Sequence, residues 1–85
     1  MTWTIYILEC NDSSFYTGIT NNLKKRLEAH NQGKGAKYTQ GKRPVELVYK
    51  ETCLNRSEAS KREYSIKLLT RDQKKEMINK TRSMN

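Results

Sequence analysis

The sequence predicts an α+β domain in which a three-stranded, mainly antiparallel sheet is flanked by helices. Two early runs of β-branched and aromatic residues, joined by a short polar turn, indicate a hairpin, and a third such run follows later. One later segment follows helical spacing at its inward positions, and two others open with helix-capping patterns, which indicates three helices. The order β-β-α-β-α-α is typical of one small α+β domain, which we assign to residues 1–80 of the 85-residue chain. Residues 81–85 are expected to form a disordered tail.

The hairpin comprises residues 3–9 (WTIYILE) and 15–20 (FYTGIT), joined by the turn cluster NDSS. Opposed residues of an antiparallel pair share a face, and the register that places Tyr6 opposite Gly18 sorts the side chains best. This register requires a loop of odd length or a bulge. An apolar face then carries Trp3, Ile5, Ile7, Phe15 and Ile19. A mixed, polar face carries Thr4, Tyr6, Leu8, Tyr16, Gly18 and Thr20.

A helix is predicted over residues 22–32, capped by Asn21 or Asn22 and ended by Gly33. Its inward positions follow the i, i+3, i+4, i+7 rule and are Leu23, Arg26, Leu27 and His30. The arginine and the histidine therefore lie on the apolar stripe or at its rim, and do not face away from the domain.

Residues 31–44 are expected to form a loop rich in glycine and lysine. Basic groups surround an aromatic ring there, namely Lys34, Lys37, Lys42 and Arg43 around Tyr38. A third strand is predicted over residues 45–51. Its expected alternation places Val45, Leu47 and Tyr49 against Glu46, Val48 and Lys50.

Two N-terminal capping patterns predict two further helices. One begins at Asn55 and runs to about residue 69, and the other begins at Thr70 and runs to about residue 79. In each pattern a side chain three residues on, Glu58 or Gln73, can complete the cap.

Glu63 is the unusual residue of the first of these helices. It lies four residues after Ala59 and three before Ile66, so it points the same way as these apolar side chains. A carboxylate turned inward needs a partner or a cation. The ordinary explanation is a salt bridge to Arg26 or Lys67, and the alternative is a bound metal ion.

The charge of the chain favours a polyanionic partner. Seventeen Lys and Arg against nine Asp and Glu give a net charge of +8. Such an excess is typical of proteins that bind nucleic acid, although basic surfaces also keep small proteins in solution. No apolar run is long enough to cross a bilayer and the N-terminus lacks signal-peptide features, so we expect a cytoplasmic protein. Cys10 and Cys53 lie far apart and are expected to be simple thiols, without zinc or a disulfide.

Four segments of the sequence, taken in order, resemble the GIY-YIG nuclease superfamily. Residues 4–6 (TIY) and 16–18 (YTG) are similar to the two halves of its signature, with threonines in place of one glycine and one isoleucine. Residues 26–30 (RLEAH) resemble the helix that bears the family's arginine and frequent histidine. Residues 58–63 (EASKRE) resemble the helix that bears its metal-binding glutamate. The resemblance spans roughly residues 3–79 and is strongest to short stand-alone bacterial members.

The resemblance implies a hydrolase that cuts phosphodiester bonds with one divalent cation, Mg²⁺ or Mn²⁺, held by Glu63. Arg26 would grip the phosphate with its two-pronged set of donors. Tyr16 would be the base that acts on water, supported by Tyr6, and His30 would relay the proton or hold a tyrosine hydroxyl. The expected nucleic-acid contacts are Lys34, Lys37, Tyr38, Lys42, Arg43 and Lys67.

These expectations describe a monomeric DNA endonuclease, selective for structure more than for sequence, with a role in DNA repair or processing. A first alternative is a non-catalytic module of the same fold that binds nucleic acid without cutting it. A second is an adaptor that docks onto another protein and uses its charge for solubility, which would require a contiguous exposed apolar patch. Neither alternative needs a glutamate that faces inward near Arg26.

Overall fold

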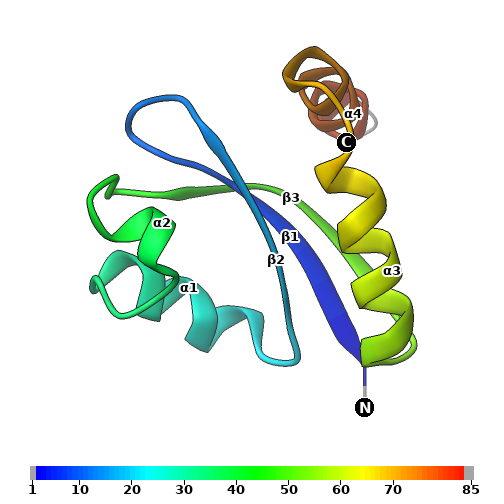
Figure 1. Ribbon diagram of the computed structural model, residues 1–85, viewed down its shortest axis with the longest axis horizontal. Coiled ribbons are helices and arrows are strands. Elements are labelled where there is room, and N and C mark those ends of the chain that lie inside the picture. Colours follow the sequence, from blue (N-terminus) through cyan, green and yellow to red (C-terminus); the bar gives the residue numbers. More distant parts are fainter. Residues whose placement is uncertain (1, 84–85) are drawn as a thin grey trace.

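A computed structural model describes the backbone of residues 2–83 and the side chains up to residue 81 (Figure 1). Its strands form one antiparallel sheet in the order β2-β1-β3. The elements are β1 (Trp3–Glu9), β2 (Phe15–Thr20), α1 (Leu23–Asn31), α2 (Lys37–Gln40), β3 (Glu46–Cys53), α3 (Arg56–Lys67) and α4 (Arg71–Ser83). Helices α1 and α2 lie on one side of the sheet, and α3 lies on the other with α4 at its end (Figure 1). The predicted α+β class and antiparallel sheet are confirmed.

The hairpin has the predicted register, with Tyr6 opposite Gly18 and Leu8 opposite Tyr16. Residues 10–14 form the turn, so the loop is of odd length as expected. Asp12 organises this turn, because its carboxylate accepts hydrogen bonds from the backbone N–H of Ser14 at 3.0 Å and from its hydroxyl at 2.6 Å. These bonds, together with Lys42, lower the pKa of Asp12 to about 2.

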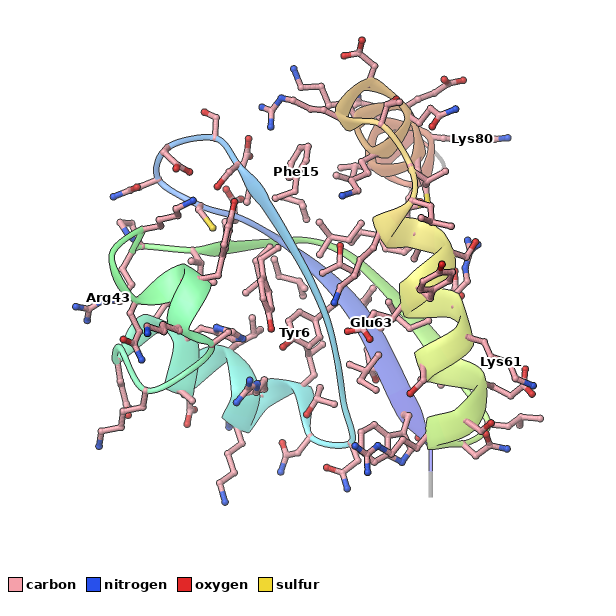
Figure 2. All side chains as sticks on the ribbon, in the orientation of Figure 1. Tyr6, Phe15, Arg43, Lys61, Glu63 and Lys80 are labelled. Atoms are coloured by element: carbon pink, nitrogen blue, oxygen red, sulfur yellow. The ribbon has the colours of Figure 1, made fainter. Side chains whose placement is uncertain are left out.

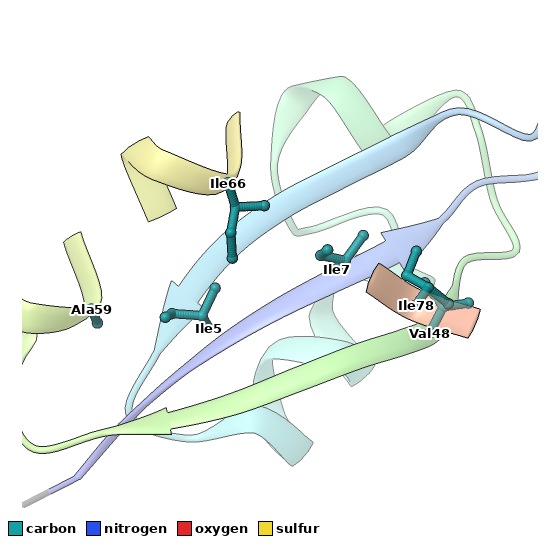
Figure 3. Close-up of a cluster of buried hydrophobic side chains, with 6 residues drawn as sticks. All are labelled: Ile5, Ile7, Val48, Ala59, Ile66 and Ile78. Atoms are coloured by element: carbon teal, nitrogen blue, oxygen red, sulfur yellow. The ribbon is translucent and has the colours of Figure 1, made fainter. Parts of the chain in front are cut away.

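Each face of the sheet carries its own apolar cluster. The first, under α3 and α4, consists of Ile5, Ile7, Val48, Ala59, Ile66 and Ile78 (Figure 3). The second, on the side of α1, consists of Tyr6, Leu8, Cys10 and Val45. The second face carries Tyr6, Leu8 and Tyr16 together as predicted, and Leu23 and Leu27 of α1 pack against this cluster and cover it.

The predicted alternation along the third strand is wrong beyond its first half. The pairing of β1 with β3 shifts between Ile7 and Leu8, which pair with Tyr49 and Leu47 and leave Val48 as the extra residue of a bulge. Because of this shift, Val48 and Tyr49 both pack in the first cluster, whereas Leu47 packs against the second.

The predicted caps are present at the starts of the helices. The side chain of Asn22 accepts from the backbone N–H of Lys25 at 3.2 Å, and that of Asn55 accepts from Glu58 at 2.9 Å. Thr70 and Gln73 cap α4 reciprocally. The backbone N–H of Thr70 donates to the side chain of Gln73 at 2.9 Å, and the backbone N–H of Gln73 donates to the hydroxyl of Thr70 at 3.2 Å.

Three helix boundaries differ from the sequence prediction. The expected loop over residues 31–44 contains the short helix α2, which begins after Gly33 (φ 79°) has ended α1. Helix α3 ends at Lys67, slightly before residue 69. Helix α4 continues to Ser83, so residues 81–83 of the expected tail are helical, and residues 84–85 lie outside the described part of the chain.

Candidate active site

A chain of hydrogen bonds runs from α1 through β1 to α2. The guanidinium Nε of Arg26 lies 3.4 Å from the hydroxyl of Tyr6, which lies 3.1 Å from Nε2 of His30. Nδ1 of His30 lies 2.8 Å from the hydroxyl of Thr39, which donates to the carbonyl of Ala36 at 2.9 Å. Tyr6, His30 and Thr39 are buried, so these bonds are shielded from water.

The last bond of this chain fixes the direction of the others. The single hydroxyl proton of Thr39 points to Ala36, so Thr39 accepts the N–H at Nδ1 of His30. A neutral His30 then has a bare Nε2, which accepts the hydroxyl proton of Tyr6. The oxygen of Tyr6 in turn accepts from Arg26. Each group therefore donates in one direction along the chain, which holds His30 in the tautomer protonated at Nδ1.

Burial and charge keep the groups of this chain in these protonation states. Burial raises the pKa of Tyr6, against the hydrogen bond from Arg26, and the charges of Tyr16 and Glu63 raise it further. Burial and the positive charge of Arg26 lower the pKa of His30. The hydrogen bond to Tyr6 raises the pKa of Arg26, to which Tyr16 also contributes. A neutral tyrosine, a neutral histidine and a cationic arginine thus share the site at neutral pH.

Two glycines leave the space that this arrangement needs. A Cβ at Gly18 would lie 2.6 Å from the hydroxyl oxygen of Tyr6 and 3.1 Å from the ring of Tyr16. A Cβ at Gly35 would collide with the ring of His30 at Nδ1 and lie 2.8 Å from its Cα. Any side chain at either position would displace Tyr6 or His30.

The ring of Tyr16 lies between the buried chain and the solvent. Its centroid is 5.3 Å from that of His30 and 6.4 Å from that of Tyr6, and its ring is half-buried. On its other flank Tyr38 stacks at 6.0 Å with an interplanar angle of 26°. The ammonium of Lys42 lies 3.7 Å from the centroid of Tyr38 and 3.3 Å from a carboxylate oxygen of Asp12.

Glu63 approaches the tyrosines from α3. Its side chain points from α3 toward the strands in Figure 2, and its charge raises the pKa of Tyr6. It is 23% exposed and forms an ion pair with Lys67, one turn along the helix, at 3.5 Å. Helix α3 packs on the face of the sheet opposite α1 (Figure 1), yet the charge of Glu63 still acts on Tyr6.

The residues around Glu63 fit a cation that retains most of its water. Within residues 2–83, no group of three or more His, Cys, Asp and Glu side chains could hold a metal ion. A single carboxylate suits Mg²⁺, which keeps several waters and often binds one or two carboxylates together with substrate phosphates. Mn²⁺ accepts the same oxygen ligands. Lys67 now neutralises this carboxylate and would have to release it.

The basic residues predicted to bind nucleic acid differ in their exposure and in the contacts they already make. Lys34 and Lys37 are exposed, whereas Lys42 is held over Tyr38. Arg43 donates to the carbonyls of Gln40 at 3.0 Å and Asn31 at 3.5 Å, so it ties the loop to the end of α1. Lys67 lies near the tyrosines, in a cleft that it lines with Tyr16 and Tyr38.

Thr39 was missed in the sequence, although it fixes the tautomer of His30. The motif KYTQ sits in a stretch rich in glycine and lysine, which indicated a loop, and nothing in such a stretch marks a threonine as buried. Gly35 is the nearest signal, because a glycine often marks a close approach of the backbone to another group.

Comparisons with known proteins show the family of this chain. A model of the GIY-YIG catalytic domain matches residues 2–77. A UPF0213 protein of Clostridium perfringens is 61% identical over 74 residues, which is 87% of this chain and 80% of that protein. A UPF0213 protein of Staphylococcus epidermidis is 58% identical over 87% of this chain and 90% of that one.

Two structures solved by NMR share the fold. A protein from E. faecalis superposes with a TM-score of 0.66 at 41% identity, over all of this chain and 90% of that one. A UPF0213 protein from Bacillus halodurans superposes with a TM-score of 0.60 at 42% identity, over 93% and 84% of the two chains. Within the described residues, no helix is long and apolar enough to cross a membrane. The chain belongs to the GIY-YIG family, whose domain is of the nuclease type, and its relatives are small bacterial UPF0213 proteins.

Proposed function

We propose that this chain is an endonuclease that hydrolyses phosphodiester bonds in DNA with the help of one Mg²⁺ or Mn²⁺. The observations that support the proposal are a cationic arginine bonded to Tyr6, Tyr16 next to that tyrosine, and a half-buried carboxylate on α3 whose charge acts on Tyr6. A structural role alone requires no such carboxylate near Tyr6. We further propose that the protein acts in the cytoplasm as a monomer, on DNA structures that arise in repair or processing.

Arg26 is the group that would bind the scissile phosphate. Its Nε already donates to Tyr6 and the guanidinium also interacts with Tyr16, so its other N–H donors would form the forked pair of bonds with phosphate oxygens. The bond to Tyr6 also fixes the plane of the guanidinium. Charge that develops on the phosphate in the transition state would thus meet donors that are already oriented.

Tyr16 is the better candidate for the group that orients and deprotonates water. Tyr6 is 1% exposed, its pKa is raised, and its proton is committed to His30. Tyr16 is half-buried, lines the cleft and lies close enough to Arg26 to affect the pKa of that guanidinium. Tyr6 and His30 would then hold Arg26 and pack against the ring of Tyr16, in a positioning role.

Glu63 would hold the cation. A bound Mg²⁺ or Mn²⁺ would supply positive charge that offsets the negative charge developing on the phosphate. Lys67, once displaced from Glu63, is free to turn toward the backbone of the substrate.

The experiment is a cleavage assay on labelled duplex, nicked, flap and branched DNA, with matching RNA, in Mg²⁺, Mn²⁺ or EDTA. We expect the wild-type protein to cut at least one branched or flap DNA with a metal present. Glu63→Gln should lower the rate about 10²- to 10³-fold. Glu28→Gln, an exposed change on α1, serves as the matched control and should cut normally.

The ion pair between Glu63 and Lys67 favours a second candidate function, the non-catalytic binding module, because it gives the carboxylate an ordinary partner. The same assay separates the two functions. Binding of branched DNA without metal-dependent products would favour the binding module. Equal cleavage by the wild-type and Glu63→Gln proteins would mean that the activity does not come from this site.

A further inference from the structure

An open cleft of about 280 Å³ lies along the edge strand β2 beside the candidate active site. It is lined by Phe15, Tyr16, Thr17, Tyr38, Lys67 and Lys74. The lining comes from β2, α2, α3 and α4, so distant parts of the chain build it together. Tyr16 belongs both to this cleft and to the cluster around His30, which makes the cleft continuous with the site.

Thr17 gives the cleft a polar group with no partner of its own. Its side chain is 4% exposed, and its hydroxyl has no hydrogen-bond partner among the described residues. Buried hydroxyls in proteins are nearly always paired, because an unpaired one lowers stability. The hydroxyl lies just beneath the lining of the cleft, so a ligand that shifts this lining slightly could supply the missing acceptor.

The charges of the cleft define that ligand as an anion. Lys67 from α3 and Lys74 from α4 both line it, and no acidic residue does. Two ammonium groups that share a cleft repel each other until an anion lies between them. Lys67 is paired with Glu63 at 3.5 Å, but an ion pair this exposed contributes little, so its ammonium can exchange the carboxylate for a phosphate without a metal ion.

The size of the cleft and the state of Tyr38 favour a phosphate over a base. The volume is below the roughly 300–1,000 Å³ of pockets that enclose drug-sized ligands, and it is ample for a phosphodiester group. The ring of Tyr38 already stacks on Tyr16 and has the ammonium of Lys42 against it. A nucleobase would have to compete with these two contacts for the ring, although Tyr38 is 46% exposed.

We propose that Thr17, Lys67 and Lys74 form a phosphate subsite that holds the nucleic-acid backbone next to the scissile bond. The subsite rests on the proposed nuclease function and adds to it the path of the strand, which would cross Tyr16 and continue over the edge of β2 toward α4. Contacts of this kind position a substrate without reading its sequence.

The test measures binding in EDTA, so that it does not depend on cleavage. A fluorescein-labelled DNA duplex with a single-stranded flap is titrated with the full-length protein, and its anisotropy is followed across a range of salt concentrations. Lys67→Gln/Lys74→Gln is compared with Lys61→Gln/Lys75→Gln, which removes the same charge from the same two helices outside the cleft. Lys61 points away from β2 (Figure 2).

The cleft variant should bind about tenfold more weakly near 0.15 M salt, and its slope of log K against log salt should fall by about 1 for each lysine. The control variant should lose clearly less affinity for the DNA. Equal losses in the two double variants would overturn the subsite and leave the proposed function standing. No binding by the wild-type protein would overturn the proposed substrate and the subsite together.

Thr17→Val tests the hydroxyl with little change of shape. We expect it to raise Tm by about 4 °C, because it removes an unpaired buried polar group, and to weaken binding about fivefold. A structural role would not combine these two effects. An unchanged affinity, or a lower Tm, would overturn the part of the proposal that assigns Thr17 to phosphate.

Discussion

Tyr6 and Tyr16 share one face of the hairpin and differ in how much water they meet. Tyr6 is enclosed between Arg26 and His30, whereas the ring of Tyr16 lines an open cleft. The surroundings of Tyr6 keep its phenol neutral, because burial raises its pKa. These differences predict separate consequences for the loss of each hydroxyl.

Tyr6→Phe should destabilise the fold, and Tyr16→Phe should mainly lower activity. Loss of the Tyr6 hydroxyl leaves Nε2 of the buried His30 without a donor, which costs about 1–3 kcal/mol. Urea unfolding of both variants measures this cost. If Tyr16→Phe lost as much stability as Tyr6→Phe and kept full cleavage activity, the assignment of their roles would be reversed.

The stability of the protein should depend on pH through His30. Its pKa is lowered in the folded state, so the unfolded chain binds a proton first as the pH falls. The stabilising effect is fully present above the unfolded value of about 6.5 and is lost as the pH falls through the folded value. The free energy of unfolding of the wild-type protein should therefore fall relative to that of His30→Gln as the pH is lowered from 7 toward 5. A constant difference between the two proteins would contradict this account.

At the scale of elements, the short helix α2 has a large effect on the geometry of the buried hydrogen-bond chain. It brings Thr39 to Nδ1 of His30, and Arg43 and Asn11 anchor the loop that follows it. The amide of Asn11 donates to the carbonyl of Arg43 at 2.6 Å, so the hairpin turn and this loop support each other. The geometry of the buried chain thus depends on a segment with no strong helical signal.

Thr39→Val should disturb His30 while preserving the shape of the core. The variant leaves the N–H at Nδ1 without an acceptor, so we expect a loss of about 1–3 kcal/mol in the free energy of unfolding. Nitrogen chemical shifts of His30 should show a mixture of tautomers in place of one. The control is Thr52→Val, an exposed position on β3. Unchanged shifts in Thr39→Val would show that Thr39 does not select the tautomer.

The sequence predicted the elements whose signals are local. Alternation placed Tyr6 opposite Gly18, and caps at Asn22, Asn55 and Thr70 marked the starts of helices. The bulge at Val48 could not be predicted in this way, because it depends on how β3 pairs with a distant strand. Helix α2 was missed for the same reason, since the burial of Thr39 depends on His30 and not on its neighbours in the chain.

At the scale of the whole molecule, the basic residues behind the net charge of +8 have different roles, which depend on where each one lies. Lys42 contacts the ring of Tyr38 and pairs with Asp12. Arg43 donates hydrogen bonds to backbone carbonyls. Lys67 and Lys74, in contrast, line a cleft beside Tyr16. Composition predicted a polyanionic partner but could not separate these roles, because they depend on which side chains the fold brings together.

DNA binding should be strongly dependent on salt and weakly dependent on sequence. Each phosphate that a lysine or arginine neutralises contributes about −0.9 to the slope of log K against log salt on duplex DNA. We therefore expect a steep slope that is equal for two unrelated duplex sequences of the same length. A flat response to salt, or a large difference between the sequences, would count against a backbone-binding site.

The central claim is that Arg26 of α1 and Glu63 of α3 act on the same phosphate. The measurement is the single-turnover cleavage rate of Arg26→Lys, Glu63→Gln and the double variant on one flap DNA in Mg²⁺. Each single change should lower the rate about 10²- to 10³-fold. The double variant should cut only slightly more slowly than the slower of the two single variants, because the effects of residues that act as a unit are not additive. Losses that multiply in the double variant, or a wild-type rate in either single variant, would contradict the claim.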